Sequence, residues 1–401
     1  MFDCNVTVGR SMLLMHQRAC WYYDMVSAFG TVLREPLLIV SPIEPRSTGN
    51  GLAMRVGNIC RVASELFNLK VAVLPFAGTP PPTGRIDRLA VTVVRAQRSH
   101  VQRPEIAPQA LASDIVSAVR PVGGSRVLAL RSYIGPVALA VAEQIDALWV
   151  GIDLDDDDEG FALRGGDLEG AARFHRLVSS TVARFSAICA SSTIDADTMA
   201  RRHGVSISTV VNGVDVPSTR PLRSSTGTRI LFVGNLTYPP NVQAALTLAH
   251  EIFPAVRQEQ SLDGTELLLV GPSDHRGPIP VLGSREGVTV AGFVPDLEPI
   301  YRASSVVVAP IFHASGTRIK ILEAFARGVP VVTTPAGASG LPVRHERHLL
   351  IAETASSLAH EVVRLLSDQP LAESLASEAF NLVHDRFSLR AQREQIAALL
   401  R

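Results

Sequence analysis

Short apolar runs, separated by stretches long enough for a helix, recur along the chain from Pro36 onward. The first half holds seven such runs, at 36–42, 70–76, 88–94, 126–131, 147–154, 186–191 and 208–214. The second half holds six, at 229–234, 266–271, 288–294, 305–310, 330–334 and 348–352. Runs that are apolar at nearly every position predict strands buried on both faces, as in parallel sheets covered by crossover helices. The pattern predicts an α/β protein with two doubly wound, Rossmann-like domains.

A stretch without periodicity separates the two series. Residues 216–228 are rich in Pro, Ser and Thr, a composition typical of a linker. We therefore expect a first domain over 36–215, a second domain over 229–385 and a C-terminal helix over 386–401. Residues 1–35 show no clear period and form an N-terminal extension whose order stays open. Ligands of open α/β sheets bind at the carboxyl ends of the strands, so we look for functional residues directly after each run.

Composition narrows the class of protein. The 401 residues are 46% hydrophobic and 19% charged, which excludes wholesale disorder, and Lys plus Arg equals Asp plus Glu at 38 each. Balanced charge gives no support for nucleic-acid binding. The four cysteines form no CxxC pair, which fits a reducing compartment, and no stretch reaches 18 apolar residues. We expect a cytoplasmic protein, and peripheral contact with a membrane stays open.

The segment "SGTRIKILEAFARGVPVVTT", 315–334, carries one of only two lysines in the chain. A strand precedes it and Gly328 ends it, so we expect a helix from about Thr317 to Arg327. At about 100° per residue, Lys320 and Glu323 share one face of that helix. The amino end of such a helix, at the carboxyl edge of a sheet, is a ready anion site.

Two interpretations of this helix face are open from spacing alone. In one, a diphosphate lies on the Gly316–Thr317 turn beside Lys320, and Glu323 accepts hydrogen bonds from two hydroxyls. In the other, the face is solvated and Lys320 forms a surface pair with Glu323.

The same segment, with "GASGL" after it, resembles the donor site of group 1 (family 4) glycosyltransferases, which have the GT-B fold. "VNGVDVP" at 211–217 and "GFVPDLEPIYRASSVVVAP" at 292–310 are also typical of that family, and the likeness extends over 229–364. The resemblance implies two domains facing across a cleft, and an enzyme of the hexosyltransferase type (EC 2.4). It would move a sugar from a nucleotide-diphosphate donor to a hydroxyl of a glycan, lipid-linked or small-molecule acceptor, as in polysaccharide biosynthesis. Retention of configuration, no metal and no cofactor besides the nucleotide sugar are further implications.

The resemblance also assigns roles. Glu323 would bind the ribose, Lys320 and the Gly316–Thr317 turn would meet the diphosphate, and the backbone of Phe293 and Val294 would pair with the base. The sequence departs from the family at three places. Ser315 stands where a glutamate usually holds the donor sugar. The basic pair expected after 229–234 is replaced by "NLTYPPNV", and "RVLALRSYIGP" offers an arginine where a histidine is common.

Two glycine loops are further candidates. Gly234 permits close approach of a ligand to the backbone, and Asn235 and Asn241 offer donors for phosphate or sugar oxygens. The alternative is a Pro-stiffened turn in which Asn241 caps the next helix. In the first domain, Gly49 and Gly51 bracket a loop that either closes over the donor phosphates or is a plain connection.

The acidic run "DLDDDDE" at 153–159 permits three interpretations: an Mg²⁺ or Mn²⁺ site like the DxD motif of the GT-A fold, a contact to the acceptor, or a solvated loop. Five histidines show no metal-ligand spacing and are expected on the surface or in loops: His175, His203, His313, His345 and His348.

A nicotinamide-dependent oxidoreductase would need GxGxxG after a strand, and the chain lacks it. A non-catalytic nucleotide-sugar-binding partner of another transferase remains the alternative function.

Overall fold

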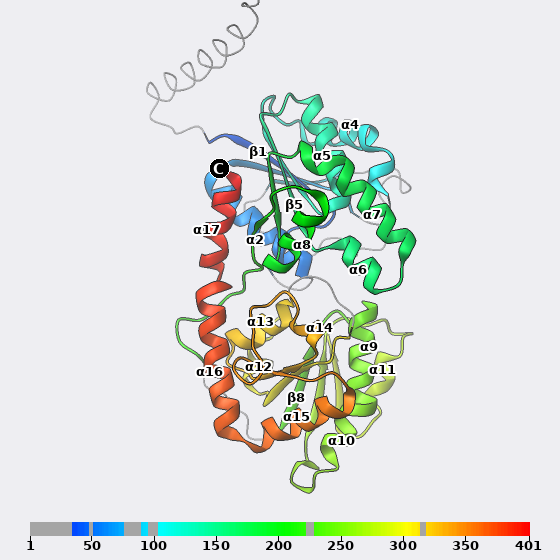
Figure 1. Cartoon of the computed structure of the whole chain (residues 1–401), viewed down its shortest axis with the longest axis vertical. Helices are drawn as coiled ribbons and strands as arrows, with labels where there is room; N and C mark the ends of the chain where they lie inside the picture. The colour runs from blue at the N-terminus through cyan, green and yellow to red at the C-terminus, as the bar shows by residue number, and fades with distance from the viewer. Residues whose placement is uncertain (1–33, 48–50, 76–89, 95–102, 222–227, 313–317) are drawn as a thin grey trace, which may run out of the picture.

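The protein is described by a computed structural model that covers residues 34–47, 51–75, 90–94, 103–221, 228–312 and 318–401. It contains two parallel sheets (Figure 1). The first has the order β3 (Ala90–Val93), β2 (Asn68–Val73), β1 (Pro36–Ser41), β4 (Arg126–Leu130), β5 (Trp149–Asp155), β6 (Ala187–Ala190) and β7 (Ser208–Thr209). The second has the order β10 (Val288–Gly292), β9 (Glu266–Val270), β8 (Arg229–Val233), β11 (Val306–Ala309), β12 (Val331–Thr333) and β13 (Leu350–Ile351). Each predicted run overlaps one of these strands, so the expected doubly wound α/β architecture is confirmed.

Helices cover both faces of the first sheet, and β1 shows why its run is apolar at every position. Leu37 and Ile39 belong to the core on one face of the sheet, while Leu38 and Val40 belong to a separate core on the other face. The helices described in this domain are α2 (Gly51–Leu66), α4 (Pro108–Val119), α5 (Gly135–Gln144), α6 (Asp158–Arg164), α7 (Leu168–Thr181) and α8 (Thr193–His203). Short 3-10 turns occupy 104–106, 132–134 and 182–184.

The second sheet is enclosed in one continuous core. Its helices are α9 (Pro239–Thr247), α10 (Phe253–Arg257), α11 (Ile279–Leu282), α12 (Glu298–Arg302), α13 (Ile319–Ala326), α14 (Pro335–Ala338) and α15 (Ala355–Ser367). A π-helical turn over 248–252 joins α9 to α10, and a 3-10 turn lies at 260–262. Two further helices, α16 (Gln369–Arg386) and α17 (Leu389–Leu400), end the chain.

The last helix returns to the first domain. In Figure 1, α16 lies along the lower domain and α17 continues upward beside α2, so the C-terminus lies at the first domain. Ile396 and Leu400 are fully buried in the core that contains Leu37 and Ile39. At the crossing point, Val214 donates to the carbonyl of Phe387 at 2.8 Å. The chain therefore passes between the domains twice, before β8 and after α16.

The carboxyl edges of the two sheets face each other. Helix α2 is the next helix after β1, and α13 is the next helix after β11, so both helices begin on the carboxyl side of their sheets. A Cβ added to Gly51 would lie 3.2 Å from the side chain of Ile319, so the amino ends of these two helices are in contact. Among the described helices, none combines the length and apolar character needed to cross a membrane.

Candidate active site

Helix α13 carries the residues that sequence analysis selected first. Ile321, Leu322 and Phe325 are fully buried against the second sheet, while Lys320 and Glu323 occupy the partly exposed side. Lys320 and Glu323 are close enough for their charges to interact: the carboxylate raises the pKa of Lys320, and the ammonium lowers the pKa of Glu323. The backbone leaves the helix through Gly328, whose φ of 65° is the left-handed conformation expected of a glycine after a helix.

Lys320 is held by residues from a different loop. Its Nζ donates to Asn241 Oδ1 at 2.7 Å and lies 4.4 Å from the ring centroid of Phe232. A Cβ on Gly234 would lie 2.8 Å from Nζ, so any other residue here would force the ammonium group to move. Three of the predicted site residues, Lys320, Gly234 and Asn241, are thus brought together at the ends of β8 and β11.

Asn241 and Asn235 differ from the capping expectation. The residue that caps α9 is Tyr238, and Asn241 instead donates from Nδ2 to the carbonyl of Asn235 at 2.9 Å. The side chain of Asn235 accepts from Thr237 at 3.0 and 2.8 Å and so shapes its own turn. Asn241 therefore links the loop after β8 to Lys320, whereas Asn235 maintains the loop.

Two cationic side chains lie near one another without an acidic partner among the described residues. Burial and, to a lesser extent, the neighbouring charge of Arg318 together lower the pKa of Lys320 to about 7, while Glu323 opposes the change. The Nε and Nη2 atoms of Arg318 are inaccessible to solvent and have no hydrogen-bond partner in the described part of the chain. Burial also lowers the pKa of Arg318, against the attraction of Asp156 across the domain interface. Buried donors of this kind are costly unless a ligand satisfies them.

Glu323 has one carboxylate oxygen engaged. Tyr301, itself fully buried, donates from its hydroxyl to Oε2 at 3.2 Å. Burial raises the pKa of Glu323, and the nearby Arg327 guanidinium opposes that shift. Within the described residues, no hydrogen bond reaches Oε1, so this oxygen is available to a ligand hydroxyl.

The remaining predicted donor residues are placed as follows. Phe293 directly follows β10 with 61% of its surface exposed, and Val294 packs partly against the second core. Gly51 begins α2 at the domain interface. Gly49, Ser315, Gly316 and Thr317 lie outside the described residues.

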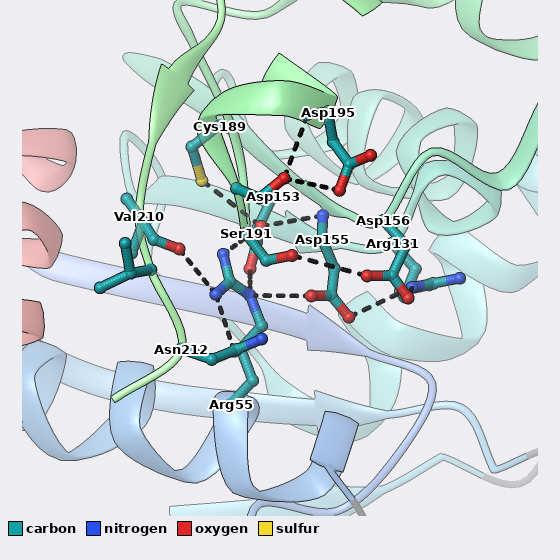
Figure 2. Close-up of polar contacts among 12 residues, drawn as sticks. Arg55, Arg131, Asp153, Asp155, Asp156, Cys189, Ser191, Asp195, Val210 and Asn212 are labelled. Carbon is teal, nitrogen blue, oxygen red and sulfur yellow. Dashed lines mark hydrogen bonds and ion pairs between the residues drawn. The ribbon is translucent and has the colours of Figure 1, made fainter. Parts of the chain in front are cut away.

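The acidic run that begins within β5 takes part in a largely buried ion-pair network (Figure 2). Arg55, from α2, donates to both oxygens of Asp153 at 2.7 and 2.8 Å, and its Nε lies 3.3 Å from Asp155. Arg131 lies 3.1 Å from Asp155 and 3.2 Å from Asp156, and it also bonds Asp158. The solvated-loop interpretation is wrong, because Asp153, Asp155 and Asp157 are buried. Asp153 and Asp155, the two carboxylates of the metal-site interpretation, are each already paired with an arginine.

This network holds the backbone in unusual conformations. Arg131 has a φ of 81° and Asp155 a φ of 61°, values that residues other than glycine rarely adopt. Burial and, to a lesser extent, the charge of Asp156 raise the pKa of Asp155 to about 7, against the opposite effect of Arg55 and Arg131. Strain of this kind gathers at functional sites, and this edge faces the second domain.

The histidine expectation holds only in part. His175 is half exposed, but the side chain of His203 is 1% exposed and His348 is buried. His348 and His345 accept hydrogen bonds from the main chain at 3.0 and 2.9 Å, so they maintain the loop before β13. His313 lies outside the described residues.

Comparison with known proteins agrees with this geometry. Residues 227–368 match the family model described as "Glycosyl transferases group 1". That match confirms the group 1 resemblance predicted for the second half, while the assignment to family 4 stays a prediction.

Two curated relatives each align with about two fifths of the chain. An uncharacterized glycosyltransferase of Methanocaldococcus jannaschii is 30% identical over 168 residues, which are 40% of this chain and 41% of that protein. An uncharacterized 44.6 kDa protein in the cps region of Klebsiella pneumoniae is 22% identical over 165 residues, 39% of this chain and 42% of its own length. The chain thus matches about two fifths of the length of these relatives.

Solved structures extend the likeness to both domains. Sucrose-phosphate synthase of Thermosynechococcus elongatus superposes with a TM-score of 0.72 at 17% identity, over 92% of this chain and 98% of that one. Anabaena HepE in complex with UDP-glucose gives 0.69 at 17% identity, over 91% and 99%. WaaG, a glycosyltransferase involved in lipopolysaccharide biosynthesis, gives 0.64 at 14% identity, over 90% and 99%. The fold is GT-B, as the resemblance implied.

Proposed function

We propose that this chain is a group 1 glycosyltransferase that moves a sugar from a nucleotide-diphosphate donor to a hydroxyl acceptor. The observation that carries the proposal is the pair of cations, Arg318 and Lys320, at the carboxyl edge of the second sheet. Neither forms an ion pair among the described residues, and both are partly removed from water. A diphosphate supplies acceptor oxygens for the unpaired donors of Arg318 and a negative charge opposite both cations.

The charge of the site suits the departing group of the reaction. When the sugar leaves, negative charge develops on the diphosphate, and preformed cations in a dry site stabilise that charge more than they stabilise the bound donor. Lys320 is fixed for this role by Asn241 and by the space at Gly234. Because its pKa lies at about 7, an arriving diphosphate would draw a proton onto the amine as it binds.

The nucleoside would extend along the same edge of the sheet. Glu323 offers its free oxygen to a ribose hydroxyl while Tyr301 holds the other. Phe293 lies at the end of β10, which the strand order places three positions from β11. At about 4.8 Å per strand, that is about 14 Å, a span suited to a nucleotide lying from its diphosphate to its base.

The first domain would receive the acceptor. Its facing edge presents Asp155, Asp156 and Arg131 in a strained, interlocked arrangement, and the charge of Asp156 acts on Arg318 across the domain interface. Structures of HepE have been solved in complex with UDP and with UDP-glucose, which supports a nucleotide-sugar donor here. Retention, independence of metal and the absence of a cofactor besides the donor are parts of the proposal drawn from the resemblance. A cytoplasmic location stays a prediction, and peripheral contact with a membrane stays open. Cell fractionation tests both.

Turnover by the purified protein tests the proposal. A panel of UDP-, GDP- and other nucleotide sugars is supplied with simple glycosides, and released nucleoside diphosphate is measured. We expect release with at least one donor, and Lys320→Ala should reduce the rate by about 10–100-fold through loss of one charge-assisted contact. Lys70→Ala is the matched control, because Lys70 lies in the first domain, where it donates to the carbonyls of Val119 and Arg120.

The same experiment separates the alternative function. A non-catalytic nucleotide-sugar-binding partner would bind a nucleoside diphosphate through Arg318 and Lys320 but release none from any donor. Equal rates for wild type and Lys320→Ala would remove Lys320 from the mechanism.

A further inference from the structure

Three side chains that the proposed reaction does not use converge in the first domain. Glu159 comes from α6, His175 from α7 and His203 from the last residue of α8. One ligand atom of each lies within 4.8 Å of the other two. The sequence gives no hint of this group, because no two of its members share a local metal-binding spacing. We propose that Glu159, His175 and His203 form a binding site for one zinc ion.

The distances suit a small tetrahedral ion. His175 Nδ1 lies 3.1 Å from Glu159 Oε2, and His203 Nε2 lies 3.8 Å from the same oxygen. A tetrahedral ion with bonds of about 2.0–2.1 Å separates its ligand atoms by about 3.3 Å. Zinc therefore fits after small side-chain movements, and two imidazoles with one carboxylate form a ligand set that zinc uses in proteins.

Neighbouring groups orient the ligands. Ser179 Oγ lies 3.0 Å from His203 Nδ1, which directs Nε2 toward Glu159. A hydrogen bond to the ring nitrogen that does not face the metal fixes the ring orientation of a metal-binding histidine. Arg202 lies 3.4 Å from the other oxygen of Glu159, so Oε2 is left for the two rings, and Arg202 is itself paired with Asp157 at 2.6 Å.

Two of the three proposed ligands have largely buried side chains and the third is exposed, so the ion would be enclosed on one side and reachable by solvent on the other. The side chain of His203 is 1% exposed and that of Glu159 is 13% exposed, whereas His175 is 49% exposed. Solvent would therefore reach the ion from the His175 side and supply the fourth ligand. The ion is structural in this proposal: it joins α6, α7 and α8 through Glu159, which belongs to the same acidic run as Asp155 and Asp156, and it takes no part in sugar transfer. The inference does not depend on the proposed function.

Zinc titration of untagged protein tests the site, since an affinity tag of histidines would itself bind the ion. After chelator treatment and dialysis, we expect one equivalent of Zn²⁺ to bind with a micromolar or lower Kd by competition with a chromophoric chelator. At a hundredfold excess over Kd, the melting temperature should rise by about 5–10 °C. Co²⁺ in place of Zn²⁺ should give the visible absorption of a tetrahedral site.

Variants distinguish this site from adventitious binding. His203→Ala and His175→Ala should each lower the affinity at least about tenfold. His175 is half exposed, so its replacement keeps the test valid if His203→Ala fails to fold. His275→Ala is the matched control, because His275 is an exposed histidine 3.6 Å from an aspartate elsewhere in the chain. Absence of zinc binding, or equal zinc binding by all three variants, would overturn the proposal and leave an ordinary His175–Glu159 ion pair.

Discussion

Protonation of Lys320 should control the affinity of this protein for UDP. Burial, with the charge of Arg318, lowers the pKa of the amine to about 7, so in the free protein about half of the molecules carry the ammonium at pH 7. At pH 9 only about 1% do, by the same titration. A bound diphosphate favours the charged form and so raises the pKa of Lys320 in the complex. If only the ammonium binds, the Kd for UDP should rise about 50-fold from pH 7 to pH 9.

Calorimetric titration with UDP at pH 7, 8 and 9 measures this dependence. The terminal phosphate has its second pKa near 6, so the charge of UDP changes little across this range. Repeating the titration in two buffers of different ionisation enthalpy should reveal uptake of about one proton per UDP at pH 8–9.

Lys320→Met provides the matched control, because the unbranched side chain keeps the packing over Phe232 without an ionisable group. Its affinity should be weaker at pH 7 and nearly constant to pH 9. A wild-type Kd that stays constant over this range, or a slope that survives in Lys320→Met, would refute the assignment of this titration to Lys320.

Three further predictions concern other parts of the structure. Gly234→Ala places a Cβ 2.8 Å from the Lys320 ammonium, so the Kd for UDP should rise by about tenfold or more by calorimetry, with little change in unfolding temperature. An unchanged Kd would mean that Lys320 can move without loss. Glu323→Ala should weaken UDP binding by about 10–100-fold but leave the Kd for inorganic pyrophosphate unaltered, since pyrophosphate has no ribose; equal losses for both ligands would contradict the ribose role. Arg55→Met leaves Asp153 buried without its guanidinium, so the free energy of unfolding in urea should fall by about 3–5 kcal/mol. Adding Asp153→Asn should recover part of that loss, and strict additivity of the two changes would argue against their coupling.

The sequence was a good guide to the strands. Parallel strands buried on both faces leave an apolar run that is hard to mistake, and Val306–Ala309 of β11 is buried at every position. The apolar side of α13 and the glycine at 328 followed from helical spacing in the same way. These features are local, so a single sequence is enough to predict them.

The contacts that define the site are not local. Arg55 and Asp153 are 98 positions apart, and nothing in either segment marks them as partners. The sequence left Asn241 open as a ligand-binding residue or as a helix cap, and it could not predict that folding places Asn241 against Lys320, 79 positions away. Arg318 was overlooked although it stands two residues before Lys320, because only burial without a partner distinguishes it from other arginines.

The position of a bound diphosphate tests the central claim most directly. A crystal structure of the protein with UDP should place phosphate oxygens within about 3 Å of Lys320 Nζ and of the Arg318 guanidinium, with a ribose hydroxyl at Glu323. UDP bound at a different place, or bound at this edge with both cationic side chains turned away from its phosphates, would contradict the account.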